Sequence, residues 1–152
     1  WALNRRGFAA AYGREVARMK RHGEPISLLS IDLDFFKAIN DQHGHAVGDQ
    51  VLVHAARTTL SALRESDHVA RFGGEEFIVL LSGTTAERAK ATALRIQALL
   101  LAARGGDLPD YTVSIGIASQ QAPDESLEAL MARADAALYR AKAAGRDRSE
   151  AA

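Results

Sequence analysis

Four stretches of the chain place apolar residues at every third or fourth position, which is the spacing of an amphipathic helix. Each stretch begins at a side chain that can accept hydrogen bonds from the free N–H groups at a helix start. The pattern predicts helices over 4–23, 49–65, 84–105 and 126–145, with N-caps at Asn4, Asp49, Thr84 (in a capping box with Glu87) and Ser126.

Other stretches have the pattern of β-strands. Ile26–Leu33 is almost continuously apolar, which is typical of a central strand covered on both faces. Residues 111–118 alternate apolar and small polar side chains with a period of two, which predicts another strand. Two shorter apolar runs, 69–72 and 77–81, flank a Gly-Gly pair and predict a β-hairpin.

The predicted hairpin turn carries two glycines followed by two glutamates. Gly73 and Gly74 can adopt the positive φ of a tight turn, and without side chains they let another group approach closely. Glu75 and Glu76 begin the second strand, where consecutive side chains point to opposite faces. Carboxylates beside a buried hairpin are costly unless a cation meets them, which favours a divalent metal. The alternative is a plain turn with a solvated pair of glutamates.

A short helix over 35–41 is predicted directly after the central strand, with Asp34 as its N-cap. Such a junction presents free backbone N–H groups to an anion. The donors belong to Phe35, Phe36 and Lys37. Plain capping remains the alternative role for Asp34. His43 and His45 follow two residues apart, which is not the spacing of a zinc pair on a helix.

The predicted order is helix, strand, helix, helix, strand, strand, helix, strand, helix, which indicates a two-layer α+β sandwich with an antiparallel sheet. A hairpin paired beside the central strand would bring Asp32, at the end of that strand, close to Glu75 and Glu76. Carboxylates combined with free backbone donors suit Mg²⁺, which takes oxygen ligands and shares substrate phosphates. The implied chemistry is phosphoryl or nucleotidyl transfer.

The composition of the chain narrows the classes of protein and of partner that it allows. The 152 residues suffice for one domain with a real core. Nineteen basic and nineteen acidic residues cancel, so no overall field favours nucleic acid or an anionic membrane. The absence of cysteine excludes disulfide and thiol chemistry and fits a cytoplasmic setting. No apolar run approaches a membrane span, and no signal-peptide pattern opens the chain, although the full-length protein could be membrane-anchored.

Four motifs in order then resemble the GGDEF domain, the catalytic domain of diguanylate cyclases, over almost the whole chain. They are IDLDFFKAINDQHGHAVGDQVL, RFGGEEF, TVSIGIA and DAALYRAKAAGRDR. The resemblance implies a fold similar to the palm of polymerases and of nucleotide cyclases (ferredoxin-like). It also implies condensation of two GTP to cyclic di-GMP with release of two pyrophosphates. Each domain would hold one GTP, so catalysis needs a homodimer.

The resemblance also assigns roles to particular residues. Asp32, the carbonyl of Leu33, Glu75 and Glu76 match metal ligands for Mg²⁺, for which Mn²⁺ can substitute. Glu75 also matches a general base, and the division of roles between the two glutamates stays open. Lys37 matches a catalytic, phosphate-holding group.

Substrate-binding positions are carried over in the same way. Asn40 and Asp49 match guanine-reading positions, and Asp49 argues against ATP because a carboxylate accepts from guanine N1–H and N2–H₂. His45 matches a substrate contact, and Gly73 and Gly74 leave room for the nucleotide. The phosphate-holding positions are Phe35, Phe36, Lys37, Lys142 and Arg146. For Lys142 and Arg146, complementing the helix dipole is the alternative.

The segment Arg64-Glu65-Ser66-Asp67 matches the family's RxxD inhibitory site for a dimer of cyclic di-GMP, with Arg95 as a further arginine. A surface turn is the alternative. At the ends, only Trp1-Ala2-Leu3 precedes Asn4, and 149–152 is too short and small for much of a final strand. We therefore expect one catalytic domain, 1–152, excised from a protein with an upstream sensory domain. The alternative function is a silent GGDEF module that binds GTP or cyclic di-GMP and regulates a partner.

Overall fold

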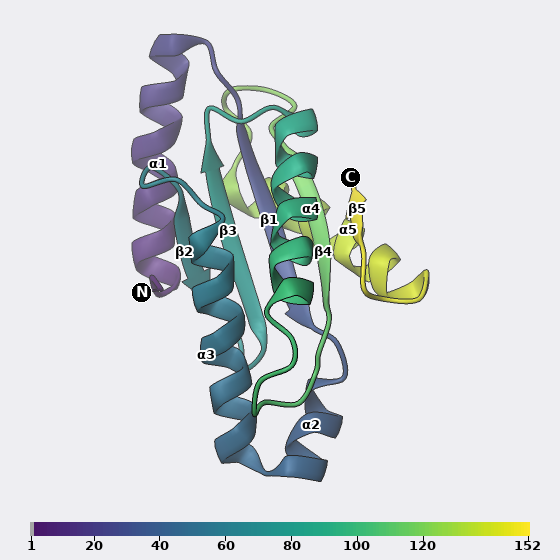
Figure 1. Cartoon of the computed structure of the whole chain (residues 1–152). Helices are drawn as coiled ribbons and strands as arrows, with labels where there is room; N and C mark the ends of the chain where they lie inside the picture. The colour runs from purple at the N-terminus through teal and green to yellow at the C-terminus, as the bar shows by residue number, and fades with distance from the viewer. Residues whose placement is uncertain (1) are drawn as a thin grey trace.

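The structure is a computed structural model that describes residues 2–152, so Trp1 lies outside the described residues. Five strands form one sheet in the order β2-β3-β1-β4-β5 (Figure 1). The elements in chain order are α1 (Arg5–His22), β1 (Ile26–Leu33), α2 (Phe36–His43), α3 (His45–Ser61), β2 (His68–Arg71), β3 (Glu76–Ser82), α4 (Ala86–Ala102), β4 (Val113–Ser119), α5 (Leu127–Ala143) and β5 (Ser149–Ala151).

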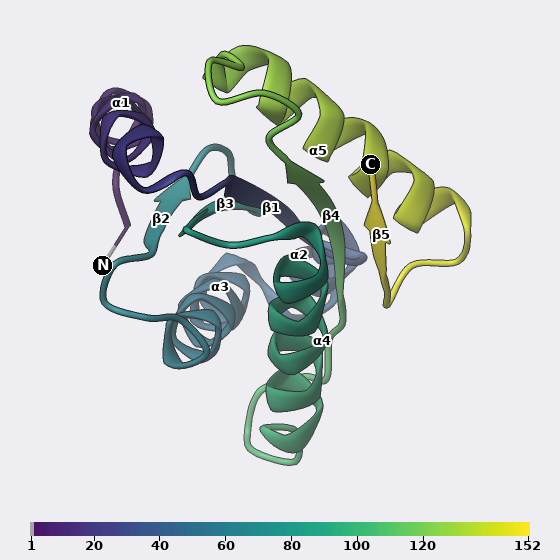
Figure 2. The same ribbon diagram turned by 90° about the horizontal axis from the view of Figure 1, so that it is seen from above.

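Helices α1 and α5 cover one face of the sheet, and α3 and α4 cover the other (Figure 2). Strand β1 lies at the centre, antiparallel to both β3 and β4, and all its residues are buried, as its apolar run predicts. The α+β class with a mainly antiparallel central sheet flanked by helices is confirmed. Within residues 2–152, no helix is long and apolar enough to span a membrane.

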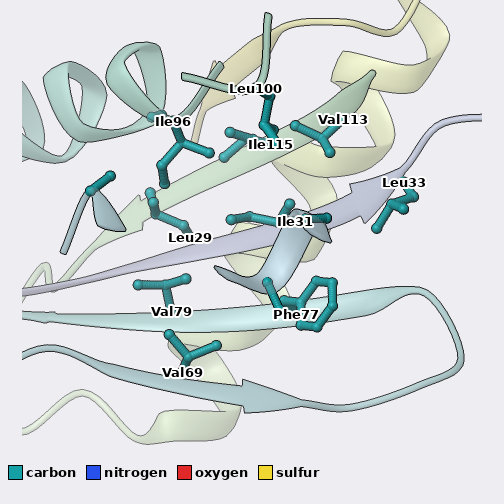
Figure 3. Close-up of a cluster of buried hydrophobic side chains, with 14 of the residues drawn as sticks. Leu29, Ile31, Leu33, Val69, Phe77, Val79, Ile96, Leu100, Val113 and Ile115 are labelled. Atoms are coloured by element: carbon teal, nitrogen blue, oxygen red, sulfur yellow. The ribbon is translucent and has the colours of Figure 1, made fainter. Parts of the chain in front are cut away.

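The alternation of β1 divides its side chains between two cores. Leu29, Ile31 and Leu33 point toward α3 and α4, where they join the larger cluster drawn in Figure 3. Ile26 and Leu28 point toward α1 and α5. The positions that continue this second face are polar, because Ser30 and Asp32 follow at the same period of two. The core on the α5 side therefore gives way to a polar site at the end of β1.

The last strand is short but it forms. Ser149, Glu150 and Ala151 pair in parallel with Ile115, Gly116 and Ile117 of β4, which makes the sheet mixed. The sequence leaves only four residues after Arg148, so local pattern gave little reason to expect a strand there. The available partner strand supplies the hydrogen bonds, including the Ala152 N–H donated to the Ile117 carbonyl at 2.8 Å.

Of the five predicted helix caps, two are confirmed and three are wrong, namely Thr84, Asp49 and, as described below, Asp34. Asn4 and Ser126 accept from backbone N–H groups three residues on, at 2.8 and 3.1 Å. Thr84 is not a cap, because its buried hydroxyl donates to the Ser82 carbonyl and Thr85 caps α4 instead. Asp49 is not a cap either, because Gly44 has φ 90° and turns α2 directly into α3. Asp49 therefore lies inside α3, which ends at Ser61 rather than near Glu65.

Candidate active site

Three carboxylates gather at one end of the sheet because the register of the strands places them there. Asp32 near the end of β1 lies directly opposite Glu76 at the start of β3. Glu75 precedes β3, and its carbonyl accepts a hydrogen bond from the Leu33 N–H at 3.3 Å. The convergence expected from the hairpin is therefore present in the fold.

The site carries more negative charge than its own cation balances. Burial raises the pKa of Glu75 and of Glu76, and the neighbouring Asp32 raises both further. Asp135, on α5, also raises the pKa of Glu76. Lys142 counters these effects, and its ammonium forms an ion pair with Asp32 Oδ2. The excess negative charge destabilises the free protein, and a bound cation would offset it.

The remaining oxygen of Asp32 provides a test of whether the site fits a metal. Asp32 Oδ1 is buried and has no hydrogen-bond partner, which is costly for a carboxylate oxygen. Within residues 2–152, no three His, Cys, Asp or Glu side chains stand close enough to chelate a cation as they are. The oxygen-only donor set still suits Mg²⁺, which keeps waters and shares substrate oxygens rather than needing a full protein cage.

The hairpin turn is built differently from the tight turn that the glycines suggest. Neither Gly73 nor Gly74 has a positive φ, so that prediction is wrong. The Phe72 N–H donates to the Glu76 carbonyl at 3.1 Å, which closes a longer loop that needs no left-handed residue. Arg71, which sequence reasoning missed, fixes this loop by donating to both glycine carbonyls, at 3.2 and 2.9 Å.

The space beside the glycines matches the expectation of close approach. Nothing lies within 4 Å of where a Cβ on Gly74 would be, and the nearest atom to one on Gly73 is Glu76 Cβ at 3.8 Å. The turn therefore leaves open volume next to the carboxylates.

The N-terminus of α2 lies beside the turn after α5. Asp34 is not the N-cap of α2, since Phe35 occupies that position with φ 55° and no side-chain cap. The Phe35 ring is 65 % exposed, and the Arg146 guanidinium lies 4.6 Å from its centroid. Lys37 is exposed in the first turn, whereas the Phe36 side chain is buried. Phe36 can therefore meet an anion only through its backbone N–H.

Asn40 and Gly48 form a close contact between α2 and α3. Asn40 Oδ1 is buried without a hydrogen-bond partner. A Cβ on Gly48 would lie 1.8 Å from that oxygen, so only glycine leaves Asn40 in this place. His45 and Asp49 are exposed on the first turns of α3. The Asn40 amide, whose oxygen has no hydrogen-bond partner, and the exposed Asp49 carboxylate therefore both lie at the contact between α2 and α3.

The Arg64 to Asp67 turn holds itself together. The Arg64 N–H donates to Asp67 Oδ2 at 2.8 Å, and its guanidinium contacts Asp67 Oδ1 at 3.3 Å and Thr84 Oγ1 at 3.0 Å. The arginine side chain remains 55 % exposed. Arg95 is exposed on α4, and its side chain makes no hydrogen bond or ion pair in the described part of the chain, so no contact joins it to the turn.

Two further polar residues at the site were not found from the sequence. Ser30 donates to Asp135 Oδ1 at 2.9 Å and lies 3.4 Å from Glu76 Oε1. A serine two residues before Asp32 in a mostly apolar strand was the available signal, because it shares the face of Asp32. Asp135 had no local signal.

The fold and the site together define a class: an α+β domain that gathers carboxylates, lysine and a helix N-terminus at one end of its sheet. Residues 3–148 match the family described as diguanylate cyclase, GGDEF domain. The chain belongs to the GGDEF family, a family of enzymes.

Relatives and solved structures agree with this assignment. Diguanylate cyclase DgcP of Pseudomonas aeruginosa is 43 % identical over 98 % of this chain, which spans 22 % of the length of that relative. The active GGEEF domain of a diguanylate cyclase from Vibrio cholerae superposes with a TM-score of 0.91 at 36 % identity, covering 99 % of this chain and 97 % of that one. The GGDEF domain of DgcB from Caulobacter crescentus, in complex with c-di-GMP, gives 0.84 at 33 % identity, over 99 % and 91 %.

Proposed function

We propose that this domain is a diguanylate cyclase that condenses two GTP into cyclic di-GMP and releases two pyrophosphates. The observation that carries the proposal is the buried, unpaired Oδ1 of Asp32 beside Glu75 and Glu76. In an ordinary structural ion pair both oxygens of such a carboxylate would be satisfied. Here one oxygen is left available beside two more carboxylates, which is the condition for binding a divalent ion.

The residues divide the binding of GTP between them. Asp32, the Leu33 carbonyl, Glu75 and Glu76 would hold Mg²⁺, or Mn²⁺ in its place. When bound, the metal supplies positive charge to the phosphate oxygens. Lys142, now paired with Asp32, is placed to turn toward those oxygens.

Further groups hold the phosphates at the start of α2. Arg146 and the exposed Lys37 supply charge there, and the N–H groups at the start of α2 supply hydrogen bonds. Gly73 and Gly74 leave space for the nucleotide beside the carboxylates.

The guanine is read at the contact between α2 and α3. Asn40 presents the amide whose oxygen lacks a partner, and Asp49 presents a carboxylate acceptor for guanine N1–H and N2–H₂. Adenine lacks both donors at those positions, so the pair selects GTP over ATP. His45 contacts the nucleotide from the start of α3.

The chemical step needs two domains. The ribose 3′-oxygen of one GTP attacks the α-phosphorus of the GTP on the partner copy, the bond from that phosphorus to the β-phosphate oxygen breaks, and pyrophosphate leaves. The 3′-hydroxyl proton passes to a carboxylate of the site, Glu75 in the assignment we favour. A second, reciprocal step closes the ring. The domain therefore acts as a homodimer, which the upstream sensory domain of the full-length protein brings together.

The direct test is to incubate the purified chain at high concentration with GTP and Mg²⁺, alone and fused to a dimeric coiled coil. Cyclic di-GMP and pyrophosphate are separated by chromatography, with Glu75→Ala/Glu76→Ala as the control. We expect one pyrophosphate for each GTP consumed and one cyclic di-GMP for every two GTP, and neither product from the control. A folded coiled-coil fusion that yields no product would overturn the activity and leave a binding module.

We further propose that the product inhibits the enzyme at Arg64 and Asp67, with Arg95 as a third contact. The exposed guanidinium of Arg64 is held in place by Asp67 and Thr84, so it presents a fixed fork to guanine or phosphate. Arg64→Ala is expected to raise the cyclic di-GMP concentration needed for half-inhibition by about tenfold or more, the loss of one charge-assisted contact.

The matched control is Arg18→Ala, which removes another exposed arginine paired with an acidic side chain, Glu15, at 3.0 Å on α1. This variant should keep the wild-type inhibition curve. If Arg64→Ala also keeps it, the turn is a structural feature of the surface and has no part in inhibition.

A further inference from the structure

Three residues with an unfavourable backbone conformation lie together in this molecule. Within residues 2–152, the non-glycine residues with positive φ are Phe35 at 55°, Arg146 at 65° and Asp147 at 49°. Phe35 is far from the other two in sequence, yet the Arg146 guanidinium lies 4.6 Å from the centre of the Phe35 ring. Left-handed conformations are costly for L side chains and persist only where the surroundings hold them, most often at functional sites.

The carboxylate of Asp34, predicted from the sequence to cap α2, instead holds the last of these residues, Asp147, while the Arg146 N–H donates to the Ala141 carbonyl at 3.0 Å. Asp34 is only 3 % exposed. Its Oδ2 accepts from Thr112 Oγ1 at 2.6 Å and from the Asp147 N–H at 3.0 Å, and its Oδ1 accepts from Ser114 Oγ at 2.7 Å. Its own N–H donates to the Thr112 carbonyl at 2.9 Å. One side chain therefore ties together the turn after β1, the start of β4 and the turn after α5.

The charge of Asp34 is balanced by neutral donors. No lysine, arginine or histidine of the described chain forms an ion pair with it. Two cations at the end of α5 and in the turn after it, Lys142 and Arg146, contact Asp32 and the Phe35 ring instead. The carboxylate thus uses its hydrogen bonds to fix backbone, and it leaves the arginine free to meet another anion.

We propose that Asp34 is a positioning residue for the triphosphate of the nucleotide, an inference that rests on the proposed function. By holding the Asp147 N–H, it fixes the turn that carries Arg146 against the start of α2. The guanidinium and the free N–H groups of α2 then face the same anion before the nucleotide arrives. Pre-organisation of this kind improves binding because the ordering cost is met during folding.

The experiment is a double-mutant cycle on nucleotide binding. Asp34→Ala, Arg146→Ala and the double variant are compared with wild type by calorimetric titration with Mg²⁺ and α,β-methylene GTP, which cannot release pyrophosphate. Each single variant is expected to bind about tenfold more weakly, about 1.4 kcal/mol. The double variant should bind no more weakly than Arg146→Ala, because Asp34 acts through that arginine. Additive losses would overturn the inference.

Two conservative variants separate positioning from general destabilisation. Ser114→Ala removes a hydrogen bond to Asp34 Oδ1 but leaves the bond to Asp147, so it should lower the melting temperature and keep the affinity. Asp34→Asn can still accept from the Asp147 N–H and should keep most of the affinity. If Asp34→Ala does not fold, Asp34→Glu replaces it, since the longer side chain displaces the Asp147 turn while the charge stays. Unchanged affinity in Asp34→Glu would contradict the inference.

The hydrogen bond from the Asp147 N–H to Asp34, here called the clamp, can be tested without nucleotide. The Asp147 amide should exchange slowly with solvent in wild type and in Asp34→Asn, and fast in Asp34→Ala or Asp34→Glu. Fast exchange in wild type would overturn the clamp. If wild type shows no binding of α,β-methylene GTP, the proposed function fails and this inference fails with it. Binding with an additive cycle removes this inference alone.

Discussion

Replacing Glu76 by glutamine is expected to make the metal-free domain more stable while removing its activity. Burial, Asp135 and Asp32 all raise the pKa of Glu76, so at neutral pH its negative charge is held at a cost. Glutamine keeps the shape and the contact with Ser30 but removes that charge. We expect a gain of about 1 kcal/mol in the free energy of unfolding, or about 3 °C in melting temperature, measured in EDTA.

The pH dependence of this gain has a defined sign. Because the folded pKa of Glu76 lies above the ordinary value of 4.5, the folded state holds the proton more tightly than the unfolded state does. The advantage of Glu76→Gln is therefore full above the folded pKa and shrinks as the pH falls through it toward 4.5. Unfolding curves of both proteins across that range would show the two stabilities converging.

Whereas the stability of Glu76→Gln in EDTA should rise, its enzymatic activity and its stabilisation by Mg²⁺ should both fall. Cyclic di-GMP production by Glu76→Gln in the coiled-coil fusion is expected to fall by about a hundredfold or more, since the proposed function makes Glu76 a metal ligand and such a ligand contributes several kcal/mol to the reaction. Mg²⁺ should raise the melting temperature of wild type more than that of the variant. The control is Glu65→Gln, an exposed glutamate without a hydrogen bond or ion pair in the described chain. A variant that is less stable than wild type in EDTA would contradict our account of the site.

The elements with strong local patterns were predictable, and the errors lie where tertiary contacts decide. The helix caps Asn4 and Ser126 depend on neighbours three residues away, so the sequence alone identifies them. The start of α3 depends on Gly44 turning the chain without a loop, and a glycine alone does not indicate that. Strand β5 depends on an open edge of β4, which exists only after the sheet has formed.

The site shows the same division between what local sequence predicts and what only tertiary contacts decide. The meeting of Asp32 with Glu76 could be expected, because a hairpin beside the central strand leaves few registers that bury both strands. The role of Asp34 could not, because its partners Thr112, Ser114 and Asp147 are 78 to 113 residues away in sequence. The strong local preference of aspartate for helix N-caps favoured the wrong answer there. Local chemistry therefore predicted the candidate ligating groups, and only the fold revealed how the carboxylates are held.

A single methyl group on Gly116 is expected to be among the most damaging changes in the domain. A Cβ there would lie 2.1 Å from the Ala134 carbonyl oxygen and 2.3 Å from the Leu138 nitrogen, which are backbone atoms of α5. No side-chain rotation relieves such a clash, so α5 must move away from β4. We expect Gly116→Ala to cost about 4 kcal/mol of stability, at the upper end for single substitutions, measured by chemical denaturation.

The loss should extend to function, because α5 carries Lys142 to Asp32 and leads into the turn of Arg146. Gly13→Ala is the matched control, since it makes the same chemical change on the exposed face of α1, where nothing lies within 4 Å of the added Cβ. It should stabilise by about 0.5–1 kcal/mol, because alanine favours a helix more than glycine does. Opposite signs for the two substitutions would place the effect in the contact between α5 and β4 rather than in glycine itself. Equal signs would mean that α5 has room to adjust, and then Lys142 and Arg146 are held by their own contacts and not by the packing of their helix.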